Sequence, residues 1–171
     1  MVEAGIAGIA SSAFPAGSFL SVLVGGAIYD RLSARQRVRI VGALLATGAL
    51  SVGLLLGLPE LQLRPAVALG MAILGTFVFG FAVSPAYYIP MSVFSIEFGR
   101  SRSGALIGWI DACGYGATMI FAPLAGALLE AAGWPTFLVA LLGVSVLSLV
   151  FLTGFLAADG RAKAVSPSDY T

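Results

Sequence analysis

The sequence predicts an all-α membrane protein, a polytopic bundle of five transmembrane helices, and three observations predict it. Hydrophobic residues make up 59% of the 171-residue chain and charged residues only 10%, whereas about a quarter of an ordinary soluble domain is charged. The charges lie in short clusters between long apolar segments, each of which reaches the ~20 residues that a helix needs to cross a bilayer. The 22 glycines supply the small side chains that let membrane helices approach closely. One transmembrane domain is therefore predicted over residues 1–171.

Charges separate the five apolar segments, and each segment is predicted to be one span. The first follows Glu3, and it is too long and too acidic at its start for a secretory signal peptide. The third contains Pro85 and Pro90, which interrupt backbone hydrogen bonding and bend a helix. These bends are either packing kinks in a long tilted helix or a functional hinge. The spans are residues 4–29, 40–59, 65–96, 103–129 and 131–158, followed by a polar tail, residues 159–171, that we expect to be disordered.

Basic residues are distributed unequally between the two sides of this predicted bundle. Eight of the nine lysines and arginines fall on one side, and only Arg64 falls on the other. Because cytoplasmic loops carry the excess of Lys and Arg, we expect an integral, multi-pass protein with its N-terminus outside and the loop of residues 30–39 inside. The basic residues of the inner side are Arg31, Arg35, Arg37, Arg39, Arg100, Arg102, Arg161 and Lys163.

Asp111 is the only charged residue inside any of the predicted spans. It lies ~12 Å along the helix from Ser103, at 1.5 Å of rise per residue, and an acid at that depth is costly unless it serves a pathway or has a polar partner. Tyr115 and Thr118 follow at i+4 and i+7, so the three side chains share one helix face. The sequence favours a substrate pathway along this face. The alternative is an aspartate that is hydrogen-bonded to a serine or a backbone group of a neighbouring helix.

The third span offers a polar face of its own, because hydroxyl-bearing residues recur along it at near-helical spacing. Tyrosine in a span often belongs to the interfacial belt, but Tyr88 lies well inside the apolar segment. We therefore expect Ser84 and Tyr88 to line a cavity. The face comprises Thr76, Ser84, Tyr87, Tyr88, Ser92 and Ser95.

A second pattern in the fourth span is a stripe of small residues, one every four positions. Its members are Gly104, Gly108, Ala112 and Gly116. Such a stripe is typical of close contact between membrane helices, so the sequence predicts that it packs against another helix.

Two segments next to the predicted inner loops carry a family resemblance. Gly26-x-x-x-Asp30-Arg31-x-Ser33-x-Arg35 resembles the loop signature of the major facilitator superfamily, which follows the second helix of each six-helix half. The chain departs from that signature where Ser33 replaces the usual glycine and where Ala34 replaces a common basic residue. The acidic-then-basic stretch from Glu97 to Gly104 resembles the inner loop that follows the fourth helix of a half.

The fourth span extends this resemblance. The stretch from Gly104 to Gly116, with Asp111 before a glycine-rich turn, and the later pair Gly133-Trp134 resemble the eleventh helix of the organophosphate–phosphate antiporters and the related sugar-phosphate exchangers. The resemblance places the chain at the eighth to twelfth helices of that fold. It therefore implies a fragment that lacks the N-terminal half of the transporter.

The resemblance implies a secondary transporter that exchanges a phosphorylated metabolite or another small organic anion by alternating access. The implied partners are membrane lipid, the missing N-terminal half and, in the complete protein, a small-molecule substrate. An inner gate is implied at Gly26, Asp30, Arg31, Arg35 and Glu97. In this gate Asp30 lies near the positive end of the fourth span, and Glu97 pairs with Arg31 or Arg35.

Other classes of function fit the sequence poorly. The chain has no histidine and a single cysteine, Cys113, so we expect no metal site and no cofactor. No nucleophile–base pair indicates an enzyme, and the arginines are too few and too dispersed to bind nucleic acid. The alternative to a transporter fragment is a non-transporting membrane subunit that acts in assembly or interaction.

Overall fold

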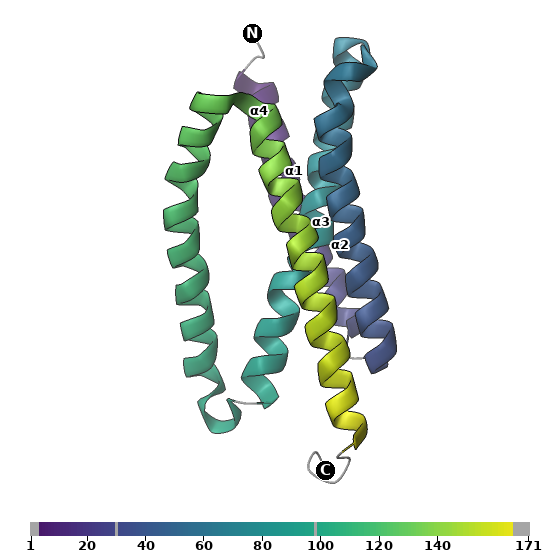
Figure 1. Ribbon diagram of the computed structural model, residues 1–171, viewed down its shortest axis with the longest axis vertical. Coiled ribbons are helices and arrows are strands. Elements are labelled where there is room, and N and C mark those ends of the chain that lie inside the picture. The colour runs from purple at the N-terminus through teal and green to yellow at the C-terminus, as the bar shows by residue number, and fades with distance from the viewer. Residues whose placement is uncertain (1–3, 30, 98, 166–171) are drawn as a thin grey trace.

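The computed structural model describes residues 4–29, 31–97 and 99–165, and these residues form helices joined by short turns, with no strand among them (Figure 1). The predicted all-α class is therefore confirmed. The elements are α1 (Ala4–Tyr29), α2 (Ala34–Gly57), η1 (Leu58–Leu61), α3 (Pro65–Glu97), η2 (Arg100–Arg102) and α4 (Ser103–Val165).

The predicted count of five separate helices is wrong. The described residues contain four helices that are long and apolar enough to cross a membrane, because the last two predicted spans belong to one 63-residue element, α4. A straight helix of that length would measure ~95 Å, about three times the ~30 Å of hydrocarbon in a bilayer. The element avoids this length by reversing direction at Gly133, where φ is 75° and ψ is 176° (Figure 1).

Gly133 divides α4 into two legs, which we name the first leg (residues 103–132) and the second leg (residues 134–165). A positive φ is accessible to glycine at little cost because glycine has no Cβ, and Pro135 follows directly in the second leg. The two legs run antiparallel, so the beginning of α1 and the end of α4 lie at opposite ends of the bundle.

Two other boundaries differ from the sequence expectation. α2 begins at Ala34 rather than residue 40, because Ser33 caps it: the Ser33 backbone N and hydroxyl both donate to Gln36 Oε1, at 2.9 and 2.8 Å. A serine at this position therefore has a local structural role. At the other end of the chain, α4 continues to Val165, so residues 159–165 of the expected disordered tail are helical.

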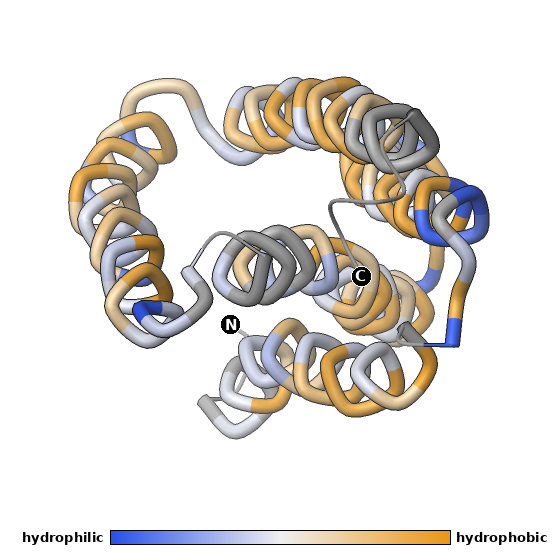
Figure 2. The backbone as a smooth tube through the Cα atoms, turned by 90° about the horizontal axis from the view of Figure 1, so that it is seen from below, coloured by the Kyte–Doolittle hydropathy of each residue, from blue (hydrophilic) through white to orange (hydrophobic). Residues whose placement is uncertain are grey.

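α3 is the central helix of the bundle, and it contacts α1, α2 and α4. Seen along the bundle, the first leg of α4 stands apart at one side, whereas α1, α2 and the second leg lie around α3 (Figure 2). Large hydrophobic side chains are exposed on each of these helices. Leu50, for example, is 75% exposed, which suits a bilayer because lipid tails need no polar covering.

α1 and α3 cross through two glycines. A Cβ on Gly17 would overlap the Phe77 carbonyl oxygen, and a Cβ on Gly80 would overlap the Phe14 carbonyl oxygen. The Gly80 carbonyl also accepts the Ser18 hydroxyl of α1 at 3.3 Å. Close backbone approach at small residues is the usual basis of packing between membrane helices, so this crossing fixes α1 on the central helix.

A small hydrophobic core joins α2 to the second leg of α4. Val41 and Leu45 of α2 are buried against Leu156, with Ala86 of α3 packed beside them. Between α2 and α3, the buried Ser51 hydroxyl donates to the Gly75 carbonyl at 2.6 Å. These contacts hold α2, α3 and the second leg together and leave the first leg outside the core.

Candidate functional site

The candidate site is built around Asp111 on the first leg of α4. Its carboxylate Oδ1 accepts a hydrogen bond of 2.8 Å from the Tyr87 hydroxyl of α3. The partner of Asp111 is therefore a tyrosine on the central helix. The sequence had suggested a serine or a backbone group of a neighbouring helix as the alternative to a pathway role. Such a bond lowers the cost of placing a carboxylate in hydrocarbon.

Gly114 makes room for this contact. A Cβ at Gly114 would lie 3.0 Å from the Tyr87 hydroxyl oxygen and 3.4 Å from its ring, which is tighter than ordinary van der Waals contact. The glycine three residues after Asp111 thus allows the tyrosine to approach the helix closely. On the first leg, the Tyr87 side chain therefore contacts both Asp111 and Gly114.

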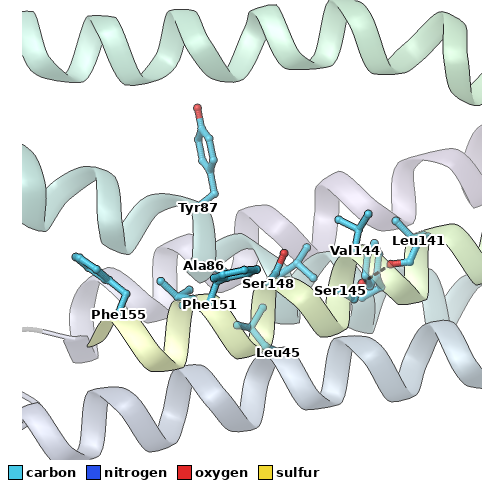
Figure 3. Close-up of a pocket in the computed structure, with 12 residues that line it drawn as sticks. Leu45, Ala86, Tyr87, Leu141, Val144, Ser145, Ser148, Phe151 and Phe155 are labelled. Carbon is cyan, nitrogen blue, oxygen red and sulfur yellow. Dashed lines mark hydrogen bonds between the residues drawn. The ribbon is translucent and has the colours of Figure 1, made fainter. Parts of the chain in front are cut away.

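A cavity of about 660 Å³ lies between α2, α3 and the second leg of α4, and Tyr87 of this pair lines it. Its size falls in the range of ~300–1,000 Å³ that is usual for small-molecule sites. Aliphatic and aromatic side chains form most of the wall, and Ser145 and Ser148 add polar residues. Figure 3 shows the Tyr87 side chain pointing from α3 toward the first leg. The lining residues are Leu45, Phe79, Val83, Ala86, Tyr87, Leu141, Val144, Ser145, Ser148, Phe151, Leu152 and Phe155.

The other predicted pathway residues lie around this pair without joining it. Tyr115 is 75% exposed, and Thr118 is exposed with its hydroxyl donating to the Gly114 carbonyl at 3.0 Å. Ser84 is buried and donates to the Gly80 carbonyl of its own helix at 2.8 Å. Tyr88 packs edge-on against Tyr87, with ring centroids 5.2 Å apart. Neither Ser84 nor Tyr88 belongs to the cavity wall, and the role of all four in a pathway stays a prediction.

The small-residue stripe of the first leg has no helix packed on it among the described residues. A Cβ on Gly104, Gly108 or Gly116 would meet no atom within 4 Å, and Ala112 is exposed. The large neighbours Trp109 and Met119 are also 73% and 79% exposed. The predicted close contact is thus absent within the described chain, and the stripe remains available to a helix from elsewhere.

The described residues among those predicted for the inner gate lie at one end of the bundle. Gly26 is near the end of α1, Arg31 is exposed in the turn that follows, and Arg35 is exposed in the first turn of α2. Glu97 is the last residue of α3, but its side chain falls outside the part that the structure describes, as does Asp30 altogether. The pairings proposed for these two acids therefore stay predictions.

Tyr87 was not predicted from the sequence to be the partner of Asp111. The sequence places Tyr87 and Tyr88 side by side on the same polar face, after the bend-forming Pro85, so the pattern alone does not tell which hydroxyl reaches the fourth span. The small residue at position 114, three after the acid, is the feature that could have indicated a bulky partner there. Ser145 and Ser148 were not predicted as site residues either, because the predicted span of residues 131–158 contains no charged residue that would mark a site.

Comparison with known proteins agrees with this architecture. The family model described as Major Facilitator Superfamily matches residues 2–169. No curated protein and no solved structure matches the chain.

Proposed function

The chain belongs to the major facilitator superfamily of membrane transporters, and from this premise we propose that it carries part of the translocation pathway of a secondary active transporter. Transport would proceed by alternating access, in which helical units rock around a site near the middle of the membrane. The observation that carries the proposal is the hydrogen bond from the Tyr87 hydroxyl to Asp111, beside an apolar cavity.

The position of the pair supports a pathway role. Asp111 lies two helical turns from the beginning of the first leg at Ser103, and acids at such depth usually face a bundle interior or a water-filled cavity. Its carboxylate accepts one hydrogen bond from Tyr87, and a carboxylate has further lone pairs that can accept. A substrate hydroxyl or a coupled proton can therefore bind at the carboxylate while Tyr87 stays in contact.

The finer part of the proposal is the substrate: a phosphorylated metabolite, or another small organic anion, exchanged against a second anion. The resemblance of the first leg to the organophosphate–phosphate antiporters supports it. The five apolar segments contain no lysine, arginine or histidine, so a phosphate in the bilayer would need its positive partner from helices other than these. The open small-residue stripe of the first leg supports packing against such helices.

Phosphate exchange tests this proposal. The complete transporter that contains this chain is reconstituted in proteoliposomes loaded with unlabelled inorganic phosphate, and uptake of [³²P]phosphate is measured against liposomes loaded with buffer alone. We expect uptake that depends on internal phosphate, because an exchanger turns over only when both sides are supplied. If no anion is taken up but counterflow of a neutral or cationic solute is found, the organic-anion assignment is wrong and the transporter assignment stands. If no solute in a broad panel shows counterflow, a non-transporting subunit replaces the whole proposal.

A further inference from the structure

We infer that Tyr87 is a positioning residue that makes the attachment of the first leg to α3 depend on what Asp111 binds. The inference rests on the proposed function, in that it assumes that a proton or a substrate group reaches Asp111. It adds a mechanical consequence: the same event that occupies the acid releases the first leg from the central helix.

The first leg has few other attachments. Among the side chains that the structure describes, the bond from Tyr87 to Asp111 is the one hydrogen bond that joins this leg to another helix. The hydrophobic core lies elsewhere, among α2, α3 and the second leg. On the first leg itself, Trp109, Tyr115 and Met119 are all more than 70% exposed. A single polar contact therefore has an unusually large share in fixing this leg.

The charge of Asp111 determines how strong that contact is. A hydrogen bond to an ionised carboxylate is roughly twice as strong as one between neutral groups. A proton on the carboxyl removes this advantage, and a substrate donor competes with the Tyr87 hydroxyl for the same oxygens. In either case the equilibrium between the docked and the undocked first leg shifts toward the undocked state. The size of the shift is set by the difference between the affinities of the two states for the proton or the substrate.

Tyr87 also connects this event to the cavity. Its side chain forms part of the cavity wall, and its hydroxyl lies between that wall and the first leg (Figure 3). A molecule that enters the cavity contacts the same side chain that holds Asp111. Filling the cavity and releasing the leg are thus coupled through one residue, without any long relay of contacts.

Two pairs of matched variants separate this role from simple packing. Tyr87→Phe removes the hydroxyl and keeps the ring, and Tyr88→Phe makes the same change on the neighbouring tyrosine. Gly114→Ala adds a methyl group against the Tyr87 hydroxyl, where contact is already close, whereas Gly126→Ala, outside the small-residue stripe, adds one to open space. In each pair the second variant is the control, because it makes the same substitution at a position that does not contact Asp111 or Tyr87 through the hydrogen bond.

The experiment measures the distance between the first leg and α3 in the full-length protein in lipid nanodiscs. Cys113 is changed to serine, and nitroxide labels are placed on cysteines at the exposed positions Met119 and Leu74. We expect the ratio of undocked to docked populations to rise roughly tenfold or more in Tyr87→Phe and in Gly114→Ala. The two control variants should keep the distance distribution of the parent protein.

Asp111→Asn provides the decisive comparison. It should shift the distribution in the same direction as Tyr87→Phe, and the double variant should shift it no further, because both changes act on one bond. A Tyr87→Phe distribution identical to that of the parent protein would overturn the inference. Since this measurement needs no substrate, it can fail while phosphate exchange succeeds, or succeed while phosphate exchange fails.

Discussion

Replacing Asp111 with asparagine is expected to lower the transport rate per molecule by roughly tenfold or more, which is the loss expected from weakening a hydrogen bond to a charged group. Asparagine keeps the size of the side chain and an oxygen that can accept from Tyr87, so the helices should still fold, although the first leg is held less tightly to α3. What it removes is the negative charge, and with it the site for a coupled proton or a charge-assisted substrate contact. Transport should also lose its response to pH.

The measurement compares solute counterflow in proteoliposomes, normalised to the amount of reconstituted protein. Glu130→Gln is the matched control, because Glu130 is an exposed acid near the other end of the first leg and is not part of the proposed pathway. Parent-like transport by Asp111→Asn would show that the acid is a packing residue. In that event only a change that also removes its polar contact, such as Asp111→Leu, should impair the protein, and it should do so through folding.

Substituting alanine for Gly80 is expected to destabilise the fold by about 1–3 kcal/mol or more, the usual cost of overpacking. The added methyl group would overlap the backbone oxygen of Phe14, and a backbone atom cannot rotate away as a side chain does. α1 would have to separate from α3, which would also lengthen the bond from the Ser18 hydroxyl to the Gly80 carbonyl.

Thermal unfolding in detergent, followed by the fraction of protein that stays monodisperse, gives the size of this effect. Gly8→Ala is the control on the same pair of helices, since its methyl group meets no atom within 4 Å. Alanine favours helix over glycine by up to about 1 kcal/mol, so this control should be neutral or stabilising. If the two variants unfold at the same temperature, α1 and α3 do not cross at Gly80.

The helices themselves were largely predictable, because charges and prolines mark their ends. The first apolar segment coincides with α1, and the third with α3 to within one residue. The beginning of α2 was missed because the Ser33 cap outweighs the polarity of the arginines that follow it, and these fit readily into a helix. The reversal of α4 was placed near Glu130 by its charge, whereas the backbone turns at Gly133 and stays helical on both sides.

The site was only partly predictable, because helical spacing shows which residues share a face but not what that face meets. The stripe of small residues around Gly108 predicted close packing, yet the close approach in the structure occurs at Gly17 and Gly80. Similarly, the depth of Asp111 predicted a polar partner, but the choice of Tyr87 depends on how α3 is rotated. The rotation of α3 is set by its contacts with the other helices, and the sequence of one span alone does not show these contacts.

The central claim, that the cavity beside Tyr87 and Asp111 belongs to a transport pathway, is tested most directly by labelling Ser148→Cys with a membrane-impermeant maleimide. Ser148 is exposed and lines the cavity, and Cys113→Ser leaves this as the only thiol. We expect the reagent to label this cysteine in both right-side-out and inside-out vesicles, with saturating substrate changing the two labelling rates in opposite directions. Reaction with a lipid-soluble maleimide alone, and with the impermeant reagent from neither side, would contradict it.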